Sequence, residues 1–433
     1  MPPSPSEPRP GSGGSVVLIR DPRYRAGGFE TWVETLAAGL RQRGILVHLL
    51  VPTPGGAETD AIQAENGRWT IPAVEGAESQ AAEVLRALEL LAAQGHAGIF
   101  FNLGYRYISL AGLHLGGSPW IPVPVAHGRH PADLDWILCG PPRRIVSPSS
   151  DYAATLRKEL ARRIGRLRAL GRVWAIPHGV PLPPADRVCE KWRHPHHRAD
   201  IAVVSRLDES AKRPWDYLRI AERLAAAAAP FRMRILGDGP CEAAMRTWIL
   251  ERQLQDRVHM EGAVSRAAVS ECLADSQILI STSESEAFGL SVAEALAHTC
   301  AVISADIPGT VREMLMDGRG IRVPAGDIAA FADAVIRLAA DWPAASRMGF
   351  QGRQYVARHY STEQMVAGYC ALLRRLHRHF RPAPDWRAPP VRYLSPGDAL
   401  AARSAGPRKL LRFFRDIGCR KGGTTPISRD HPA

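Results

Sequence analysis

The sequence predicts an α/β protein in which two doubly wound, Rossmann-like parallel-sheet domains face each other across a cleft. Short, nearly all-apolar segments alternate with segments of helical period along most of the chain. Apolar strands of this kind are buried on both faces, as in a parallel sheet covered by helices. The alternation breaks over residues 183–198 and then restarts, and 433 residues suffice for two or three domains.

The first half of the chain shows this alternation after a Pro-, Gly- and Ser-rich leader. Strands are expected at residues 15–20, 45–51, 98–101, 121–127, 143–147 and 173–176. Helices are expected at residues 29–44, 79–93 and 151–163. Each apolar run is short enough for a strand, and each intervening segment has a helical period.

The second half repeats the pattern. Strands are expected to begin near Ile201, Met233, Val258, Gln277, Cys300 and Gly320. Helices are expected at residues 214–228, 242–253, 266–274, 290–298, 311–316, 329–341, 345–359 and 362–379.

These elements predict a domain plan. It comprises a disordered leader (1–14), an N-terminal domain (15–182), a linker (183–198), a C-terminal domain (199–360) and a basic tail (381–433). The closing helix over residues 361–380 is expected to pack back on the N-terminal domain.

Composition narrows the class of protein. Hydrophobic residues make up 45% of the chain, but no run of about 18 apolar residues predicts a transmembrane helix. The leader lacks the apolar core of a signal peptide. Seven cysteines without a C-x-x-C pair favour reduced thiols in the cytosol over disulfides or zinc. We therefore expect a cytoplasmic protein.

The positive charge is concentrated at the end of the chain. Of the net charge of +12, +10 lies from Arg374 onward. Within the tail, Leu410, Phe413, Phe414 and Ile417 have helical spacing with basic residues opposite, which predicts a short amphipathic helix. It is either a solvated extension or a segment that docks on an anionic inner membrane surface. Nucleic acid is not expected as a partner, because no nucleic-acid motif occurs.

The segment Glu286-Ala-Phe-Gly-Leu-Ser-Val-Ala-Glu294 is the most informative part of the sequence. It follows a predicted buried strand, turns at Gly289 and begins a helix at Leu290. The N–H groups of a helix start are free to bind phosphate. Two carboxylates separated by seven residues can contact opposite ends of an extended ligand, with a diphosphate between them.

Candidate cations lie at the end of the first strand of the C-terminal domain. Arg206 stands in Ser205-Arg-Leu, and Lys212 follows six residues later, next to Arg213. Such a pair can neutralise a diphosphate leaving group. The alternative is a solvated pair at a helix start, and the sequence alone leaves both open.

Glycines after strands mark further places where a ligand can come close to the backbone. Gly237 and Gly239 form a tight turn after the strand near Met233, which needs no ligand but could admit a base or ribose. Gly27 and Gly28 precede the first helix, so its start can approach a phosphate or sugar. The alternative there is a flexible turn. No G-x-G-x-x-G motif occurs, which disfavours dinucleotide binding.

Two histidines also follow strands. His127 ends a strand of the N-terminal domain before a glycine, at an edge that would face the cleft. His178 lies near the junction of the domains. A histidine in either position is structural or functional, and His127 is the stronger candidate.

Taken in order, these motifs resemble those of the retaining nucleotide-sugar glycosyltransferases with the GT-B fold, glycosyltransferase family 4. The resemblance covers about residues 16–375, and its most specific element is the match of residues 286–294 to E-x-F-G-L-x-x-x-E. The family has asparagine where His178 stands, and its spacing from the arginine to the lysine is usually one residue shorter.

The resemblance implies a role for each motif. Arg206 and Lys212 would hold the diphosphate, and Glu294 would accept hydrogen bonds from the ribose. Glu286 would hold the donor sugar and phosphate together with the backbone of Phe288, Gly289 and Leu290. His127 would lie beside the transferred sugar, and Gly28 would approach the diphosphate.

The implied reaction is sugar transfer with retention from a nucleoside-diphosphate sugar to a hydroxyl of a glycan or lipid-linked acceptor, in bacterial cell-surface polysaccharide or lipopolysaccharide synthesis. The cations and the helix start would replace a metal ion, so no metal or other cofactor is expected. Alternatives are an epimerase or a phosphorylase of the same fold, or a non-catalytic nucleotide-sugar-binding protein. A phosphorylase would need a lysine for pyridoxal phosphate, and no lysine is singled out.

Overall fold

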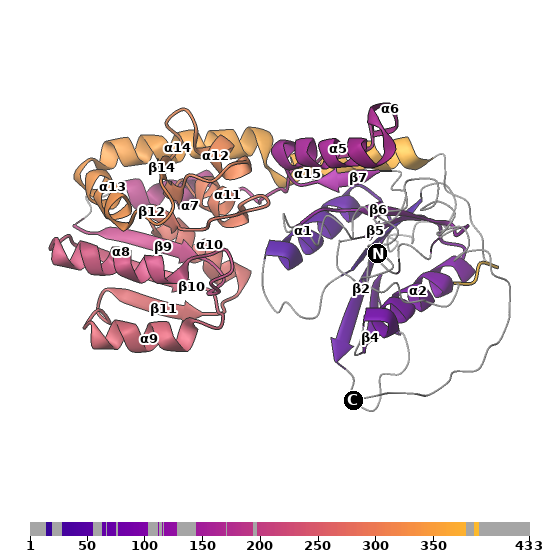
Figure 1. The fold of residues 1–433 in the computed structure, drawn as a ribbon, viewed down its shortest axis with the longest axis horizontal. Helices are drawn as coiled ribbons and strands as arrows, with labels where there is room; N and C mark the ends of the chain where they lie inside the picture. Colours follow the sequence, from indigo (N-terminus) through magenta and orange to yellow (C-terminus); the bar gives the residue numbers. More distant parts are fainter. Residues whose placement is uncertain are drawn as a thin grey trace, which may run out of the picture.

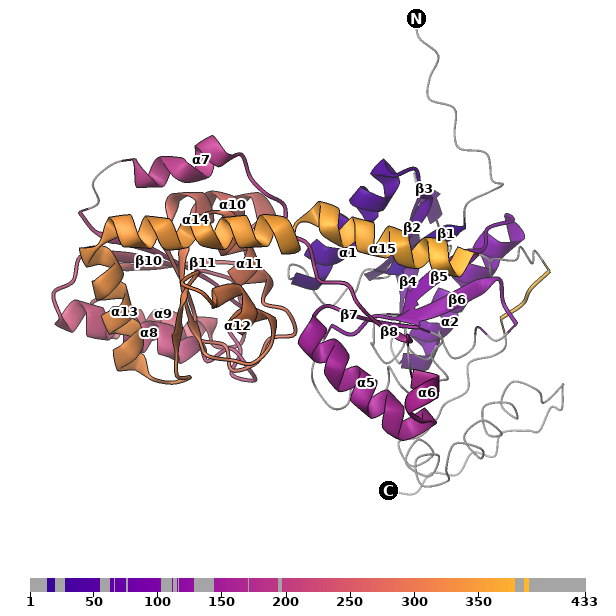
Figure 2. The same ribbon diagram turned by 90° about the horizontal axis from the view of Figure 1, so that it is seen from above.

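The protein is described from a computed structural model. The structure describes residues 14–19, 28–54, 63–65, 67–74, 77–102, 111, 115, 117–127, 144–169, 171–193, 197–377 and 385–388. Gly27, residues 1–13 of the predicted leader and the predicted tail helix lie outside these ranges. Two domains lie side by side and are connected twice by the chain (Figures 1 and 2).

The N-terminal domain is built on a sheet whose described strands have the order β3-β4-β2-β1-β5-β6. The strands are β1 (Ser15–Ile19), β2 (Val47–Pro54), β3 (Gln63–Glu65), β4 (Arg68–Ala73), β5 (Gly98–Asn102) and β6 (Trp120–Pro124). Neighbouring strands are parallel except β3, which pairs antiparallel with β4. The sequence does not predict this hairpin, because β3 is too short for a recognisable alternation and β4 contains Pro72, a residue typical of sheet edges.

Helices α1 (Gly28–Gln42) and α2 (Ala77–Ala93) connect the strands of this sheet. A separate pair of strands, β7 (Ile145–Ser147) and β8 (Val173–Ala175), extends the edge beyond β6 through a bridge between Val125 and Val146. Helices α5 (Ser150–Ile164) and α6 (Arg166–Ala169) lie between β7 and β8 in the chain. Every residue of β1 is buried, as expected for a central strand of a covered sheet.

The C-terminal domain has the order β11-β10-β9-β12-β13-β14, and its neighbouring strands are all parallel. The strands are β9 (Ala199–Val204), β10 (Phe231–Leu236), β11 (Val258–Gly262), β12 (Ile278–Ser281), β13 (Ala301–Ala305) and β14 (Ile321–Val323). The helices are α8 (Pro214–Ala226), α9 (Glu242–Glu251), α10 (Arg266–Asp275), α11 (Leu290–Ala297), α12 (Thr310–Leu315), α13 (Ile328–Ala340) and α14 (Trp342–His359).

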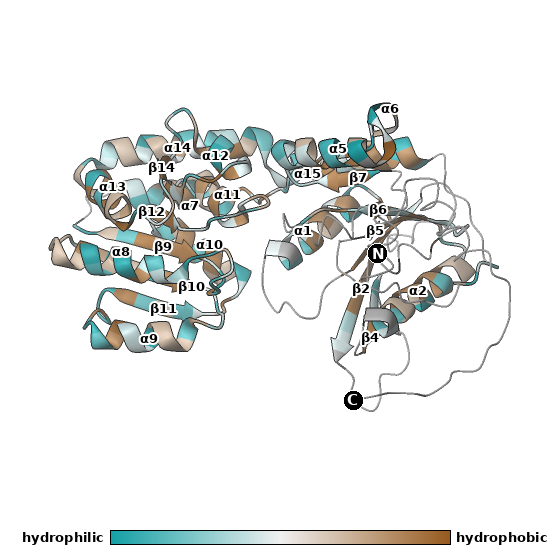
Figure 3. Ribbon diagram, in the orientation of Figure 1, coloured by the Kyte–Doolittle hydropathy of each residue, from teal (hydrophilic) through white to brown (hydrophobic). Residues whose placement is uncertain are grey.

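The order in which strands are added to the sheet reverses at β9, which pairs with β10 on one side and with β12 on the other. Ligands of doubly wound sheets bind at such a point, outside the carboxyl ends of the strands. Figure 3 shows hydrophobic colours on the strands of both domains and hydrophilic colours on much of the outer helical surface, as separate buried cores require.

The chain crosses between the domains at two adjacent segments. Helix α14 ends on the C-terminal domain, and α15 (Thr362–Leu376) returns to the N-terminal domain, where Tyr369 joins the core (Figure 2). Val180 N–H donates to the Tyr360 carbonyl at 2.8 Å, and Thr362 N–H donates to the Val180 carbonyl at 3.2 Å. A Cβ on Gly179 would lie 2.6 Å from the Ser361 carbonyl oxygen, so glycine permits this close crossing.

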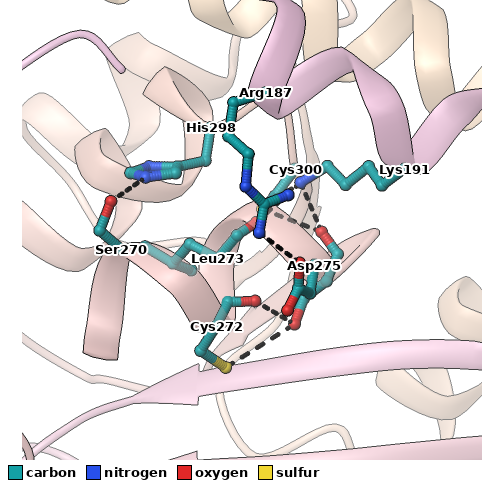
Figure 4. Close-up of polar contacts among 9 residues, drawn as sticks. Arg187, Lys191, Ser270, Cys272, Leu273, Asp275, His298 and Cys300 are labelled. Atoms are coloured by element: carbon teal, nitrogen blue, oxygen red, sulfur yellow. Dashed lines mark hydrogen bonds and ion pairs between the residues drawn. The ribbon is translucent and has the colours of Figure 1, made fainter. Parts of the chain in front are cut away.

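The predicted linker contains regular structure. Helix α7 (Ala185–Cys189) and a 3₁₀ turn (Glu190–Trp192) pack against the C-terminal domain. The buried Lys191 ammonium donates to the carbonyl oxygens of Leu273, at 2.8 Å, and Ser276, at 2.6 Å, both at the end of α10 (Figure 4). Val188 and Trp192, four residues apart, are the sequence signal that could have predicted this helical segment.

We expect Lys191→Met to lower the free energy of unfolding by about 2 kcal/mol. Methionine retains most of the volume, but two buried carbonyl groups lose a charge-assisted donor. Urea denaturation followed by circular dichroism measures the change, and Lys158→Met, at an exposed position, is the control. Equal stability of both variants and the parent would show that this contact contributes nothing.

Candidate functional site

A cavity of about 560 Å³ lies between the two domains at the carboxyl ends of their strands. Its C-terminal wall comes from the segments after β9, β10, β11 and β12 and from the start of α11. Its N-terminal wall comes from α1, the end of β6 and the crossing segment. The predicted residues that line it are Gly28, His127, Arg206, Lys212, Gly237, Glu286, Phe288, Gly289, Leu290 and Glu294. Of the predicted site residues, Gly239 alone does not line the cavity.

Helix α11 begins at the cavity because Gly289 adopts a left-handed conformation, with φ of +90°. A Cβ at this position would lie 2.4 Å from Val311 Cγ2, so the turn accepts only glycine without a shift. No side chain caps this helix start. The first backbone N–H groups, at Leu290 and Ser291, lack acceptors within the helix and line the cavity. The positive end of the helix therefore faces the cavity.

Lys212 is the cation of its loop that lines the cavity. Its Nζ lies 2.5 Å from Oε1 of Glu286, and each side chain is 17% exposed. Arg213 has φ of +49° and instead binds Asp216 and Glu284, each at 2.5 Å. The unusual spacing after Arg206 therefore leaves Lys212, and not Arg213, at the cavity.

Two hydrogen bonds hold the Lys212 loop against the segment that carries Glu286. The Thr282 hydroxyl donates to the Lys212 carbonyl at 3.0 Å. Glu284 N–H donates to the Ala211 carbonyl at 2.8 Å. Backbone contacts thus set the distance between the cation and the carboxylate.

Arg206 lines the cavity from a more exposed position. Its side chain is 51% exposed and pairs with Asp208 at 3.0 Å. The guanidinium is therefore accessible at the mouth of the cavity, whereas Lys212 lies deeper.

The fold itself requires glycine at both predicted positions of the turn after β10. A Cβ on Gly237 would lie 1.9 Å from the Ser205 carbonyl oxygen, and one on Gly239 would lie 2.5 Å from that of Leu207. The two glycines let this turn pack against the segment of Arg206. Only Gly237 borders the cavity.

Glu294 lies partly buried in the second turn of α11. Burial raises the pKa of its carboxyl group to about 7, and the positive charge of Arg266 opposes this shift. Glu286 precedes α11 and Glu294 lies within it, so the helix start separates the two carboxylates along the chain while both line the cavity. A ligand that donates hydrogen bonds would favour the ionised form of Glu294.

His127 and His178 belong to an aromatic cluster on the other wall. Their rings stack with centroids 5.2 Å apart. His178 also contacts Phe288 at 5.3 Å, edge to face, and Trp32 packs against His127 at 4.5 Å. Burial lowers the pKa of His178 to about 3, and burial with the neighbouring His178 lowers the pKa of His127. Both imidazoles are therefore neutral near pH 7.

The starts of two helices, one from each domain, meet at the cavity. A Cβ on Gly28 at the start of α1 would lie 2.7 Å from Cδ1 of Leu290 at the start of α11. Glycine at position 28 thus leaves room for the Leu290 side chain against the start of α1. Across the same boundary, Nη1 of Arg266 donates to Oγ1 of Thr35 at 3.1 Å.

Sequence reasoning missed several residues that line the cavity, among them Glu30, Thr31, Glu34 and Arg266. The first three share one face of α1, which a helical wheel could have shown. Arg266 directly follows the capping residue Ser265. Nothing in its local pattern distinguishes it from a solvated arginine. Among the described residues, no group of three His, Cys, Asp or Glu side chains is placed to hold a metal ion.

Comparisons with known proteins agree with this architecture. Residues 186–355 match the family model described as "Glycosyl transferases group 1". Sucrose-phosphate synthase from Thermosynechococcus elongatus superposes with a TM-score of 0.68 at 21% identity, covering 84% of this chain and 99% of that structure. The fold is therefore the GT-B arrangement of two facing Rossmann-like domains.

Curated relatives align with a shorter part of the chain. The N-acetyl-α-D-glucosaminyl L-malate synthase of Bacillus anthracis is 30% identical over 139 residues, which is 32% of this chain and 36% of the relative. The GDP-mannose:cellobiosyl-diphosphopolyprenol α-mannosyltransferase of Xanthomonas campestris is 32% identical over 133 residues, 30% of this chain and 34% of the relative. The match thus spans about a third of the length of these relatives.

We expect the stability of the protein to fall between pH 4.5 and 7 because of Glu294. The folded-state pKa of about 7 exceeds the ordinary value of 4.5, so the folded protein binds more protons than the unfolded chain in this window. The loss amounts to about 3 kcal/mol. Denaturation at a series of pH values should show that Glu294→Gln removes this part of the slope. An identical slope in both proteins would contradict the raised pKa.

Proposed function

We propose that this protein transfers a sugar from a nucleoside-diphosphate sugar to a hydroxyl of a glycan or lipid-linked acceptor, with retention of anomeric configuration and without a divalent metal ion. The observation that carries the proposal is the convergence of Lys212, Arg206 and the start of α11 on one cavity between GT-B domains. Three sources of positive charge at one point suit a diphosphate leaving group. The match to a glycosyltransferase family model supports the same reaction class.

In the proposed reaction, the bond between the anomeric carbon and the diphosphate oxygen breaks. The electron pair leaves with the diphosphate, and positive charge develops on the sugar. Lys212, Arg206 and the first N–H groups of α11 stabilise the negative charge on the leaving group. The acceptor oxygen then bonds to the anomeric carbon on the same face, and its proton passes to the departing phosphate oxygen.

The two carboxylates have separate roles in this proposal. Glu294 accepts hydrogen bonds from the ribose hydroxyls, which requires its ionised form. Glu286 holds the donor sugar and orients Lys212 through the 2.5 Å contact. Both side chains are largely shielded from water, so the pair keeps the lysine ammonium in place before the diphosphate binds.

The N-terminal wall would face the sugar and the acceptor. His127 and His178 are neutral near pH 7 and present an aromatic surface with Phe288 beside the transferred sugar. A neutral imidazole can donate or accept a hydrogen bond without adding charge near an oxocarbenium-like centre.

We infer that the acceptor belongs to bacterial cell-surface polysaccharide or lipopolysaccharide synthesis. The name of the Xanthomonas campestris relative includes a diphosphopolyprenol-linked acceptor, which supports a lipid-linked substrate here. A cytoplasmic enzyme held at the inner membrane surface would suit such an acceptor. No helix in the described part of the chain is long and apolar enough to cross a membrane.

We expect Lys212→Ala and Glu286→Ala each to reduce turnover of the donor by about 10²–10³ while the protein remains folded. Each variant removes charge stabilisation or sugar positioning at the leaving group. The effect is measured by steady-state kinetics with the nucleotide sugar that the protein binds. Arg219→Ala, an exposed residue of α8 outside the cavity, is the control. Full activity of both cavity variants would remove these residues from the mechanism.

We expect Gly28→Val to weaken nucleotide binding by about tenfold, because the added side chain meets Leu290 and separates the two helix starts. Leu290→Ala in the same chain removes the obstruction and should restore most of the affinity. Isothermal titration with nucleoside diphosphates measures both. A double variant as weak as Gly28→Val would mean that the contact does not control the cavity.

A screen distinguishes transfer from the remaining alternatives. Thermal shift with a panel of nucleotides and nucleotide sugars should identify the donor, since a ligand bound only to the folded state raises apparent stability. That donor is then incubated with and without acceptors. Conversion of the sugar without an acceptor would indicate an epimerase. Binding without turnover across acceptors would indicate a non-catalytic binding protein.

A further inference from the structure

Positive charge outside the tail is concentrated on one short segment of the N-terminal domain. Residues 150–172, which contain α5 and α6, carry seven Lys and Arg against two Asp and Glu. The other residues before Arg374 carry 34 Lys and Arg against 37 Asp and Glu. The basic charge of the folded part of the protein is therefore local to this segment, and the proposed reaction does not use it.

Four of these cations line a shallow hollow on the outer surface. The hollow has a volume of about 640 Å³ and is lined by Arg157, Lys158, Arg162 and Arg166 together with small residues of α5, α6 and the turn before β8. None of the described residues that line it is acidic. Glu159, on α5, pairs with Arg162 at 3.4 Å and offsets part of the charge. Arg157 also donates to the Val173 carbonyl at 3.2 Å, which holds this part of α5 against β8.

An apolar side chain protrudes beside the hollow. Leu167, in α6, is 86% exposed, whereas the other exposed large hydrophobic residues of the described chain reach at most 64%. Gly165 and Gly171, with φ of +85° and +68°, turn the chain on either side of α6. In Figure 1, α6 stands out from the edge of the N-terminal domain. Burial of a leucine side chain is favourable, so Leu167 offers an apolar contact to a partner that binds the basic hollow beside it.

We propose that the surface formed by Arg157, Lys158, Arg162, Arg166 and Leu167 docks the N-terminal domain on an anionic lipid leaflet. The cations would contact lipid phosphates, and Leu167 would enter the boundary between the headgroups and the acyl chains. Because the surface is positively charged, charge complementarity favours an anionic partner. One protruding apolar tip on a convex edge suits a lipid layer better than a folded protein, which binds through a larger packed apolar patch.

A nucleic acid fits the surface less well. Binding of single strands relies on aromatic side chains on which bases stack, and none of the described lining residues of the hollow is aromatic. Figure 3 shows mainly hydrophilic colours along α5, whose apolar residues Tyr152, Leu156 and Leu160 are buried within the domain, so the exposed apolar contribution comes from Leu167. The surface lies on the domain proposed to bind the acceptor, but docking requires neither the cavity nor the tail.

The test is co-sedimentation of the full chain with phosphatidylcholine vesicles that do or do not contain phosphatidylglycerol. Lys158→Glu/Arg166→Glu should reduce the partition coefficient on anionic vesicles by more than about twentyfold, since one basic residue contributes about fivefold. Leu167→Ser should reduce it by about tenfold. Leu250→Ser, at a leucine that is 64% exposed on the C-terminal domain, and Arg86→Glu, on α2, are matched controls that should retain binding.

Each outcome decides the proposal. Undiminished partition of both α5–α6 variants would overturn it, and so would equal losses in the matched controls. Binding of the parent to phosphatidylcholine alone with the same strength would exclude recognition of anionic lipid. A single-stranded RNA bound more tightly than the anionic vesicles, with the same loss in the variants, would reassign the surface to nucleic acid. Donor turnover with a soluble acceptor should be unchanged in all these variants, so failure here is separate from failure of the proposed reaction.

Discussion

The start of α11 is the constraint on which the cavity depends. Gly289 can adopt its left-handed conformation against Val311, so the helix begins where its N–H groups point between the domains. The Lys212 loop is held against the segment before this turn by hydrogen bonds from the Thr282 hydroxyl and the Glu284 N–H, and Gly28 lets the start of α1 lie against Leu290. Positive charge from several elements thus converges at one point because glycines allow backbones to approach there.

The two domains contribute different physical properties to the cavity. The C-terminal wall is ionic, with Lys212 and Arg206 beside Glu286 and Glu294. The N-terminal wall combines the neutral, stacked pair of His127 and His178 with the acidic start of α1. A site with charge on one side and an aromatic surface on the other suits a ligand with an anionic end and a sugar end. The paired crossing at Val180 and Ser361 holds the walls together.

Much of the architecture could be predicted because strands buried on both faces are short, apolar and separated by helical segments. The β3–β4 hairpin could not be, since three residues carry too little pattern to identify an edge strand. Helix α7 was read as part of a linker because its composition is mostly polar, and only the spacing of Val188 and Trp192 signals it. Its stability depends on Lys191 and neighbouring residues packing on α10. Arg266 was missed because only the approach of Thr35 from the other domain distinguishes it.

The sequence by itself determined the class of fold and the residues around the start of α11, because the motif from Glu286 to Glu294 is local and its glycine turn follows from neighbouring residues. The tertiary structure decided which cation lines the cavity, since Arg213 is drawn away by Asp216 and Glu284. It also decided that Gly239 supports the fold and not the cavity wall, and that Glu294 holds its proton to about pH 7. These properties depend on burial and on contacts between distant segments, which no local pattern encodes.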